Sequence, residues 1–350
     1  MVDLFSEKSL EFRKDNFKIM KYARNIERYL KSYLLISVPI IVNCATIGLK
    51  TGEQYLLNSN LLIDEQGYGK TTILKYILAN NNPKIFRMLP EKMYAYELLK
   101  LGNEFFNNKI LIHEDLLKSF KGLTQKSLEQ LSTFWVSVLS EHGWKQLNSE
   151  LKNVRCNVMF GMAEVGYFAN KLRLFGETFF ERIVPIFQYK RDLGEKMNIL
   201  EHKDDIDDKD EKLPKLKLSI NPNSPKKIIL KDESIKKRTR ELALELEINI
   251  QLAGTRALSY IRQFMKANAL LNERNRVTKS DLELYEMIHD LHTSARHKRI
   301  TYIVKETIEK NKGLSFEKMA RKINISLPTF LKYKNIVKGM LGKSKGQKEL

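Results

Sequence analysis

The chain has 350 residues, 43% of them hydrophobic, which is enough for two or three domains that each bury a core. It carries 61 Lys and Arg against 42 Asp and Glu, a formal net charge of +19. This excess favours polyanionic partners, either nucleic acid or an anionic membrane surface. Cys44 and Cys156 lie far apart and form no CxxC pair, so the sequence predicts neither a disulfide framework nor a structural zinc site.

Residues 1–32 have the pattern of an amphipathic helical segment and lack the apolar core of a signal peptide. We therefore expect a protein of the cytoplasm or nucleoid, and not a secreted one. The most apolar run, residues 33–49, is interrupted by Ser37, Pro39 and Asn43 and falls short of the ~20 residues that a membrane span needs. It predicts a buried element and no membrane partner.

Residues 33–200 are predicted to form an α/β core. Short apolar strands alternate there with longer helical stretches, which is typical of a parallel sheet with helices on its faces. The expected strands are residues 55–63, 109–112, 157–160 and 183–187.

The rest of the chain divides by composition. Charge blocks and prolines predict a linker or surface insertion over residues 201–236. Helical periodicity then resumes over residues 237–296, and a short basic unit occupies residues 298–350.

The stretch LLIDEQGYGKTTILKYI, residues 61–77, has the layout of a phosphate-binding loop between a strand and a helix. Gly67 and Gly69 allow the backbone to approach phosphates, Lys70 supplies the cation and Thr71 a hydroxyl for Mg²⁺. Asp64 stands where the strict GxxxxGK[ST] pattern has glycine and could weaken binding. The alternative is a chance loop with solvated lysines. The expected nucleotide contacts are Gly67, Tyr68, Gly69, Lys70, Thr71 and Thr72.

A second motif is KILIHEDLLKSF, residues 109–120, in which an apolar strand ends in two acids. Phosphoryl transfer needs one carboxylate for the metal and another that orients the attacking water. Glu114 and Asp115 are the candidates for these roles, in the reverse of the usual Asp-Glu order. The alternative for this stretch is a helix cap that follows a strand.

Together these motifs resemble the AAA+ ATPases, and more narrowly the minichromosome maintenance helicases, over roughly residues 30–290. Further similar stretches are FGETFFERIVPIFQYKRD (175–192) and GTRALSYIRQFMKANALLNERNRVTKSDLELYEMI (254–288). The resemblance implies an ATPase core followed by a helical lid, with ATP and Mg²⁺ as cofactors. It also implies that Arg182 is an arginine finger, which reaches a neighbouring subunit's site in a ring or filament, and that Arg256 senses the γ-phosphate from the lid. The stretches that resemble the family do not include its large N-terminal DNA-binding region with the zinc knuckle.

Two stretches differ from the family pattern or carry less information. At the end of the strand NVMFGMAEV, Ala163 or Glu164 falls where the family has an asparagine. Residues 141–156 lie where relatives carry a DNA-binding hairpin. Trp144 and Lys145 are expected at its tip, where an aromatic ring beside a cation suits single strands, although a buried tryptophan is an equal alternative.

The basic unit, residues 298–350, holds 14 Lys and Arg against 4 Asp and Glu. Residues 314–337 have the pattern of a helix-turn-helix or winged helix, in which Asn324 adopts the left-handed turn and Ser326 caps the second helix. The first helix should turn Phe316, Met319, Ala320 and Ile323 inward. The second helix should present Thr329, Lys332, Tyr333 and Lys334 to DNA.

His289 and His292 have a metal-compatible spacing on one helix, but no further ligand is near in sequence. We expect solvated surface histidines.

The sequence therefore predicts an ATP-hydrolysing, DNA-binding oligomer of DNA replication, most similar to a reduced helicase of this type from a mobile element. Two alternatives are an origin-binding initiator or helicase loader, and a non-catalytic DNA-binding scaffold with a degenerate nucleotide site.

Overall fold

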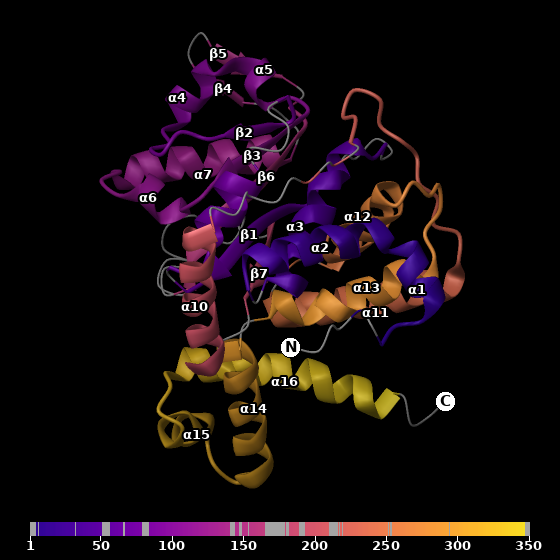
Figure 1. Ribbon diagram of the computed structural model, residues 1–350. Helices are drawn as coiled ribbons and strands as arrows, with labels where there is room; N and C mark the ends of the chain where they lie inside the picture. The colour runs from indigo at the N-terminus through magenta and orange to yellow at the C-terminus, as the bar shows by residue number, and fades with distance from the viewer. Residues whose placement is uncertain are drawn as a thin grey trace.

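The computed structural model describes residues 5, 7–31, 33–50, 57–65, 67–78, 84–140, 144–146, 149–152, 154–164, 179, 182–188, 193–209, 216, 218, 220–250, 252, 254–293 and 295–346. Its centre is a five-stranded, wholly parallel sheet with the strand order β2-β3-β6-β1-β7 (Figure 1). The strands are β1 (Ser59–Asp64), β2 (Phe86–Met88), β3 (Lys109–His113), β6 (Cys156–Ala163) and β7 (Ile183–Phe187).

Helices cover both faces of the sheet, because successive side chains of a strand point to opposite faces. On β1, Leu62 joins one core, whereas Leu61 and Ile63 join the other. The helices of the first face are α1 (Leu10–Asp15), α2 (Phe17–Tyr29), α3 (Leu34–Cys44), α11 (Glu233–Ile250), α12 (Gly254–Leu271) and α13 (Lys279–His289), together with the π-helix η2 (Thr72–Leu78) and the 3₁₀ turns η1 (Ala45–Gly48) and η3 (Asp290–His292). Those of the second face are α4 (Ala95–Lys100), α5 (Gly102–Phe106), α6 (Leu116–Phe120) and α7 (Gln125–Leu139).

The strands expected from the sequence are present, with shifted ends. The strand expected at residues 55–63 begins at Ser59, and Leu57 and Asn58 lie ahead of it. Residues 55 and 56 lie outside the described part of the chain. The third extends to Ala163. The short edge strand β2 was not expected.

The apolar run predicted to be buried forms α3, in which every residue except Leu35 is buried and Pro39 lies inside the helix. Within the described residues, no helix is long and apolar enough to cross a membrane.

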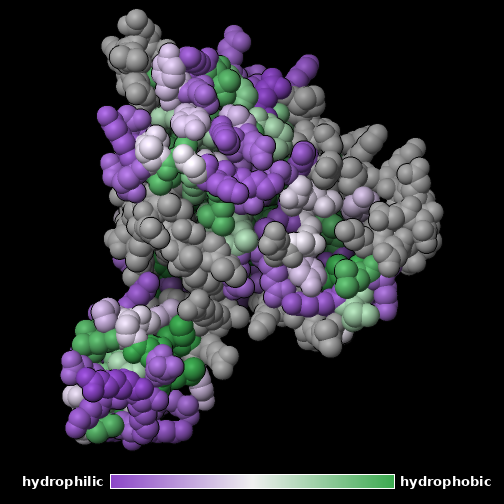
Figure 2. All heavy atoms as spheres, turned by 90° about the vertical axis from the view of Figure 1, so that its left-hand side faces the viewer, coloured by the Kyte–Doolittle hydropathy of each residue, from purple (hydrophilic) through white to green (hydrophobic). Residues whose placement is uncertain are grey.

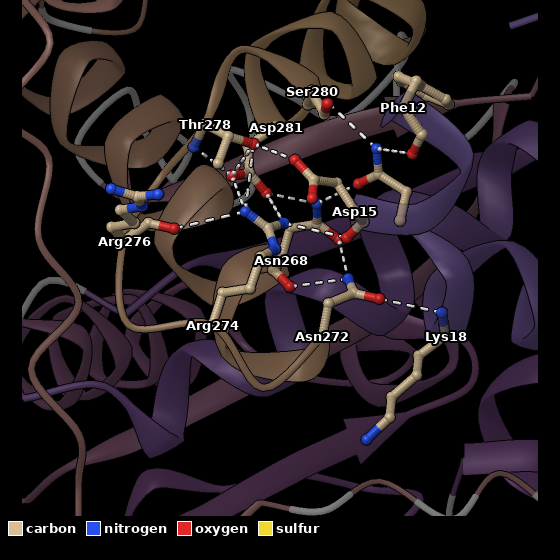
Figure 3. Close-up of polar contacts among 11 residues, drawn as sticks. Phe12, Asp15, Lys18, Asn268, Asn272, Arg274, Arg276, Thr278, Ser280 and Asp281 are labelled. Atoms are coloured by element: carbon tan, nitrogen blue, oxygen red, sulfur yellow. Dashed lines mark hydrogen bonds and ion pairs between the residues drawn. The ribbon is translucent and has the colours of Figure 1, made fainter. Parts of the chain in front are cut away.

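The N-terminal helices are fastened to α12 and α13 by a buried polar network (Figure 3). The carboxylate of Asp281 accepts two hydrogen bonds from Arg274, both 2.7 Å, and one from the Asn268 amide at 2.6 Å. That amide also donates to the side-chain oxygen of Asn16, at the start of α2. Thr278 and Asp281 form a capping box at the N-terminus of α13.

The charged stretch predicted as a linker is in part helical. Helix α10 (Leu193–Lys209) runs through the first nine residues of the expected insertion, and α11 begins at Glu233. The charge blocks were interpreted as a linker. A helix that is exposed to solvent needs no apolar face, so such a composition is also compatible with a helix.

The C-terminal helical unit consists of α14 (Ala295–Lys310), α15 (Phe316–Lys322) and α16 (Leu327–Gly346), and it lies below the sheet in Figure 1. Asn324 has φ 52° and the Ser326 hydroxyl caps α16, as expected. Two predicted orientations are wrong. Tyr333 is only 8% exposed because it packs in the core of this unit, and Phe316 is 42% exposed.

The strands β4 (Trp144–Gln146) and β5 (Ser149–Leu151) pair antiparallel and pack against α4 and α5. Trp144 pairs with Leu151 and Lys145 with Glu150, so both residues lie within the paired strands. The placement of Trp144 and Lys145 at the tip is therefore wrong: Trp144 opens the first strand.

Candidate functional site

The candidate site lies at the carboxyl ends of β1, β6 and β3. In parallel sheets, ligands bind in the crevice outside these ends. Because β6 lies between β1 and β3, the loop after β1 and the acids after β3 meet at one edge of the sheet. Asp64 is in register with Ala163, and His113 with Phe160.

The loop after β1 turns on two glycines with left-handed backbones, Gly67 with φ 88° and Gly69 with φ 105°. Only glycine adopts such values without strain. The Lys70 ammonium lies over the loop, where it donates to the carbonyl oxygens of Asp64 (2.9 Å) and Glu65 (2.5 Å). The helix that leads into η2 begins at Lys70, and Thr71 is exposed there.

Asp64, the departure from the loop pattern, is buried at the end of β1. Its backbone is not among the positive-φ residues in the described part, so a glycine is not required at this position. Its carboxylate accepts a hydrogen bond from the Tyr33 hydroxyl (2.7 Å) and another from the backbone N–H of Glu65 (2.7 Å). Tyr33 and Leu30 also pack over Gly69, where an added Cβ would lie 3.2 Å from a Leu30 methyl. The carboxylate thus has protein donors for both of its oxygens.

Helix α10 also contacts the loop after β1, through Lys196. The Lys196 ammonium forms an ion pair with Glu65 (2.7 Å) and lies over the Tyr68 ring, 5.4 Å from its centroid. Tyr68 is half-buried at this position in the loop.

Glu114 has a side-chain oxygen that lacks a hydrogen-bond donor among the described residues. Its Oε2 is buried and has no hydrogen-bond partner in the part of the chain that the structure describes. Gly161 of β6 allows the backbone of Glu114 to lie close to the sheet, because a Cβ there would lie 2.2 Å from the backbone carbonyl oxygen of Glu114 and 3.0 Å from a methyl of Leu74 in η2. Glu114 and the helix after Lys70 therefore meet at Gly161. A buried carboxylate oxygen without a partner is costly unless a cation approaches it, so the donor set fits Mg²⁺.

Asp115 serves as the N-cap of α6, where it accepts from the N–H of Leu117 at 3.1 Å. The helix-cap alternative is therefore correct for Asp115. The cap uses one of roughly four lone-pair positions of the carboxylate. The turn is oriented by buried His113, whose Nδ1 accepts from the Asp115 N–H (3.2 Å) and whose Nε2 lies 2.8 Å from the Ser119 hydroxyl. Burial lowers the pKa of His113, so it stays neutral.

Ala163 ends β6 beside Asp64, and Glu164 follows it; both are half-buried. Among the described residues, Glu164 is the polar residue that directly follows the carboxyl end of β6.

Arg182 lies at the opposite edge of the sheet. It precedes Ile183, which is in register with Ser59 at the start of β1, whereas Lys70 follows the end of β1. Five residue steps of β1 separate these levels, about 17 Å at ~3.3 Å per residue. The guanidinium Nε of Arg182 donates to the Ser140 hydroxyl (2.7 Å). Arg182 therefore cannot reach the loop of its own chain.

Arg256 lies in the first turn of α12 and is half-buried. One turn later the buried Tyr260 hydroxyl bonds to the amides of Asn43 and Asn60, which ties α12 to β1. Leu270, near the other end of α12, lies beside Gly48, ahead of β1. Helix α12 therefore runs antiparallel to β1, and its N-terminal turn points toward the candidate site.

The expectation of solvated surface histidines is wrong. His292 is fully buried, and its Nδ1 donates to the Pro185 carbonyl of β7 (2.8 Å). His289 is 9% exposed and lies 3.2 Å from a carboxylate oxygen of Glu245. No group of three or more potential metal ligands of the His, Cys, Asp and Glu types occurs among the described residues.

Of the expected DNA contacts on α16, Lys332 is exposed, Lys334 lies 4.2 Å over the Phe316 ring, and Thr329 bonds to Ser326 (2.8 Å). Figure 2 shows hydrophilic side chains over much of the lower part of this unit.

Sequence reasoning missed Tyr33, His113 and Lys196. Tyr33 and Lys196 lie 31 and 132 positions from Asp64, so no local pattern connects them to the loop. The signal in the sequence was Asp64 itself, which stands where the loop pattern has glycine. A buried acid needs hydrogen-bond donors, so a donor such as Tyr33 was to be expected near it.

No protein-family model matches the sequence, and a comparison with curated proteins finds no significant match.

Proposed function

We propose that the protein is an AAA+ ATPase of DNA replication that binds DNA and works as an oligomer. The observation that carries this proposal is that the backbone of Glu114 and the helix after Lys70 meet at Gly161, while the side chain of the same Glu114 has a buried oxygen, Oε2, without a hydrogen-bond partner among the described residues. A glycine turn with a lysine suits phosphates, and a nearby carboxylate suits their metal.

In this proposal Lys70 leaves the loop carbonyls and binds the β- and γ-phosphates of ATP, while the N–H groups around Gly67, Tyr68 and Gly69 accommodate the chain of phosphates. Thr71 and Glu114 would hold Mg²⁺, which would supply positive charge against the phosphates. Asp115 accepts a proton from the attacking water with its remaining lone pairs. Arg256 approaches the γ-phosphate from the helical lid, α11–α13.

Arg182 acts on the neighbouring subunit. The separation of about 17 Å between the levels of Arg182 and Lys70 along β1 supports an action between chains. An arginine supplied in trans stabilises charge on the transferring phosphoryl group, and such a residue contributes on the order of 10³-fold or more to turnover.

A mixing experiment tests this shared site. Lys70→Ala and Arg182→Ala proteins should each be inactive in ATP turnover, but their mixture should regain activity at sites that combine Lys70 of one subunit with Arg182 of the next. The matched control is a mixture of Lys70→Ala with Glu114→Ala, which lack groups from the same half of the site and should stay inactive. No nucleotide binding by the unmodified protein, or no recovery in the first mixture, would contradict the proposal.

DNA binding is assigned to the C-terminal unit as a helix-turn-helix. Lys332→Gln should weaken duplex binding in a fluorescence anisotropy assay, because Lys332 is exposed on α16. Tyr333→Phe is the control, since that ring is buried and should leave the affinity unchanged.

The loader and scaffold alternatives are separated by two measurements. Unwinding of a forked duplex by the protein alone favours a helicase over a loader. Nucleotide binding without turnover favours the scaffold, for which Ala163 is the supporting observation, because alanine cannot orient water.

A further inference from the structure

Helices α11 and α12 carry a group of cations outside the candidate site. Arg262 and Lys266 lie one turn apart on α12, and both are half-buried. Arg240 of α11 acts electrostatically on Arg262, and Lys227, ahead of α11, acts on Lys266. We call these four residues the α11–α12 basic cluster.

Counter-charge is scarce around the cluster. Glu233 acts on Arg262, but its side chain is 75% exposed and is already paired with Lys236 at 2.7 Å. In the described part of the chain, the charges that act on Lys266 are both positive, from Arg262 and Lys227. The Nε of Arg262 is buried and has no hydrogen-bond partner among the described residues.

Such an arrangement is unfavourable in isolation. Burial first, and then the neighbouring cations, lower the pKa of both Lys266 and Arg262. Half-buried like charges repel each other and lose hydration, and a bound anion offsets both costs. A guanidinium and an ammonium on one helix face are suited to phosphate oxygens.

We propose that the α11–α12 basic cluster binds phosphates of a nucleic-acid backbone and so forms a second DNA contact beside the C-terminal unit. Helix α11 connects the two. Ile248 of α11 packs against the core of the C-terminal unit, eight residues after Arg240, which is about 12 Å of helix. A duplex carries one charge per ~1.7 Å of its axis, so a tract along this path presents several phosphates.

The test compares Arg262→Gln/Lys266→Gln with the control Lys121→Gln/Lys126→Gln, which removes two exposed lysines near α6 and α7 and changes the net charge equally. Affinity for a short duplex is measured by anisotropy over a salt series. We expect the first variant to bind several-fold more weakly and its log–log salt slope to fall by about one for each phosphate that the variant no longer neutralises. The control should match the unmodified protein. Lys227→Gln/Arg240→Gln, at exposed positions, repeats the test if the first variant fails to fold.

Equal affinity and slope in all proteins would overturn the proposal. So would thermal stabilisation by inorganic phosphate that is lost in the variant while duplex binding persists, since the cluster then takes a free anion. ATP turnover without DNA should be unchanged in the variants, so this test and that of the nucleotide site fail separately.

Discussion

The Asp64 carboxylate is buried at the end of β1 and receives a hydrogen bond from Tyr33. Tyr33→Phe should lower the free energy of unfolding by about 1–3 kcal/mol, because a buried anion loses a donor. Urea denaturation measures this effect. Tyr302→Phe is the matched control, since that ring is 63% exposed and its change should be close to neutral.

A double-mutant cycle with Asp64→Ala isolates the bond between the two side chains. Residues in direct contact should show a coupling of roughly 0.5–3 kcal/mol, and additive effects of Tyr33→Phe and Asp64→Ala would contradict the contact.

His292 should make stability depend on pH. Burial lowers its pKa to about 3, because a charge on the ring would be enclosed between α13 and β7. The unfolded chain, with a His pKa near ~6.5, takes up the proton first as the pH falls. Stability from this group is therefore complete above ~6.5 and lost on acidification, by about 2 kcal/mol between pH 7 and pH 5.

His292→Asn provides the comparison, since its amide can still donate to Pro185 but does not titrate. Denaturation midpoints at pH 7 and pH 5 should converge in this variant relative to the unmodified protein. An equal pH dependence in both would exclude His292 as the source, and would leave His113, whose pKa is also lowered, as a candidate.

The positions of side chains could be predicted where a local pattern carries them, as for Lys70 after β1 and Glu114 after β3, which lie at the carboxyl ends of these strands. Burial could not be predicted at Tyr333 or His292, because aromatic and imidazole side chains occur both inside and outside proteins. Both residues are buried by contacts with elements distant in sequence: Tyr333 in the core of the C-terminal unit and His292 against β7.

At the scale of elements, the polar network that attaches α1 and α2 to α12 and α13 is centred on one buried ion pair, between Arg274 and Asp281. Asp281→Asn should lower the free energy of unfolding by about 3–5 kcal/mol, because the Arg274 guanidinium keeps its charge but loses its partner. Chemical denaturation measures the loss.

Glu273→Gln is the control for that prediction. Its ion pair with Lys18 joins α2 to the loop between α12 and α13, but the Glu273 side chain is 69% exposed. Exposed pairs contribute at most about 1 kcal/mol, so equal losses in the two variants would contradict the role of burial.

The order of strands and helices in the sheet was largely predictable because β3, β6 and β7 consist mainly of apolar residues. The sheet is parallel, as the alternation with helices indicated. β2 was not predicted because three residues are too few to show the alternation of apolar and polar side chains that marks a strand. α10 was not predicted because its charged residues resembled those of a linker. Which strands are neighbours is set by crossovers that the pattern does not encode.

At the scale of the whole molecule, a site shared between chains predicts a dependence on concentration. Specific ATP turnover should rise with protein concentration at fixed, saturating ATP, because dilution separates Lys70 from the partner's arginine. The measurement is turnover per chain over a wide dilution range. A constant value down to concentrations at which light scattering shows monomers would contradict the trans arrangement.

The N-terminal helices touch two regions at once: α1 and α2 pack into the core that α12 and α13 share, and Leu30 covers Gly69 of the glycine turn. Proteolytic clipping ahead of α3 would therefore strip one wall from that core and uncover the turn in the same event. Aggregation and loss of nucleotide affinity should then appear together, since a single cut removes the support of both.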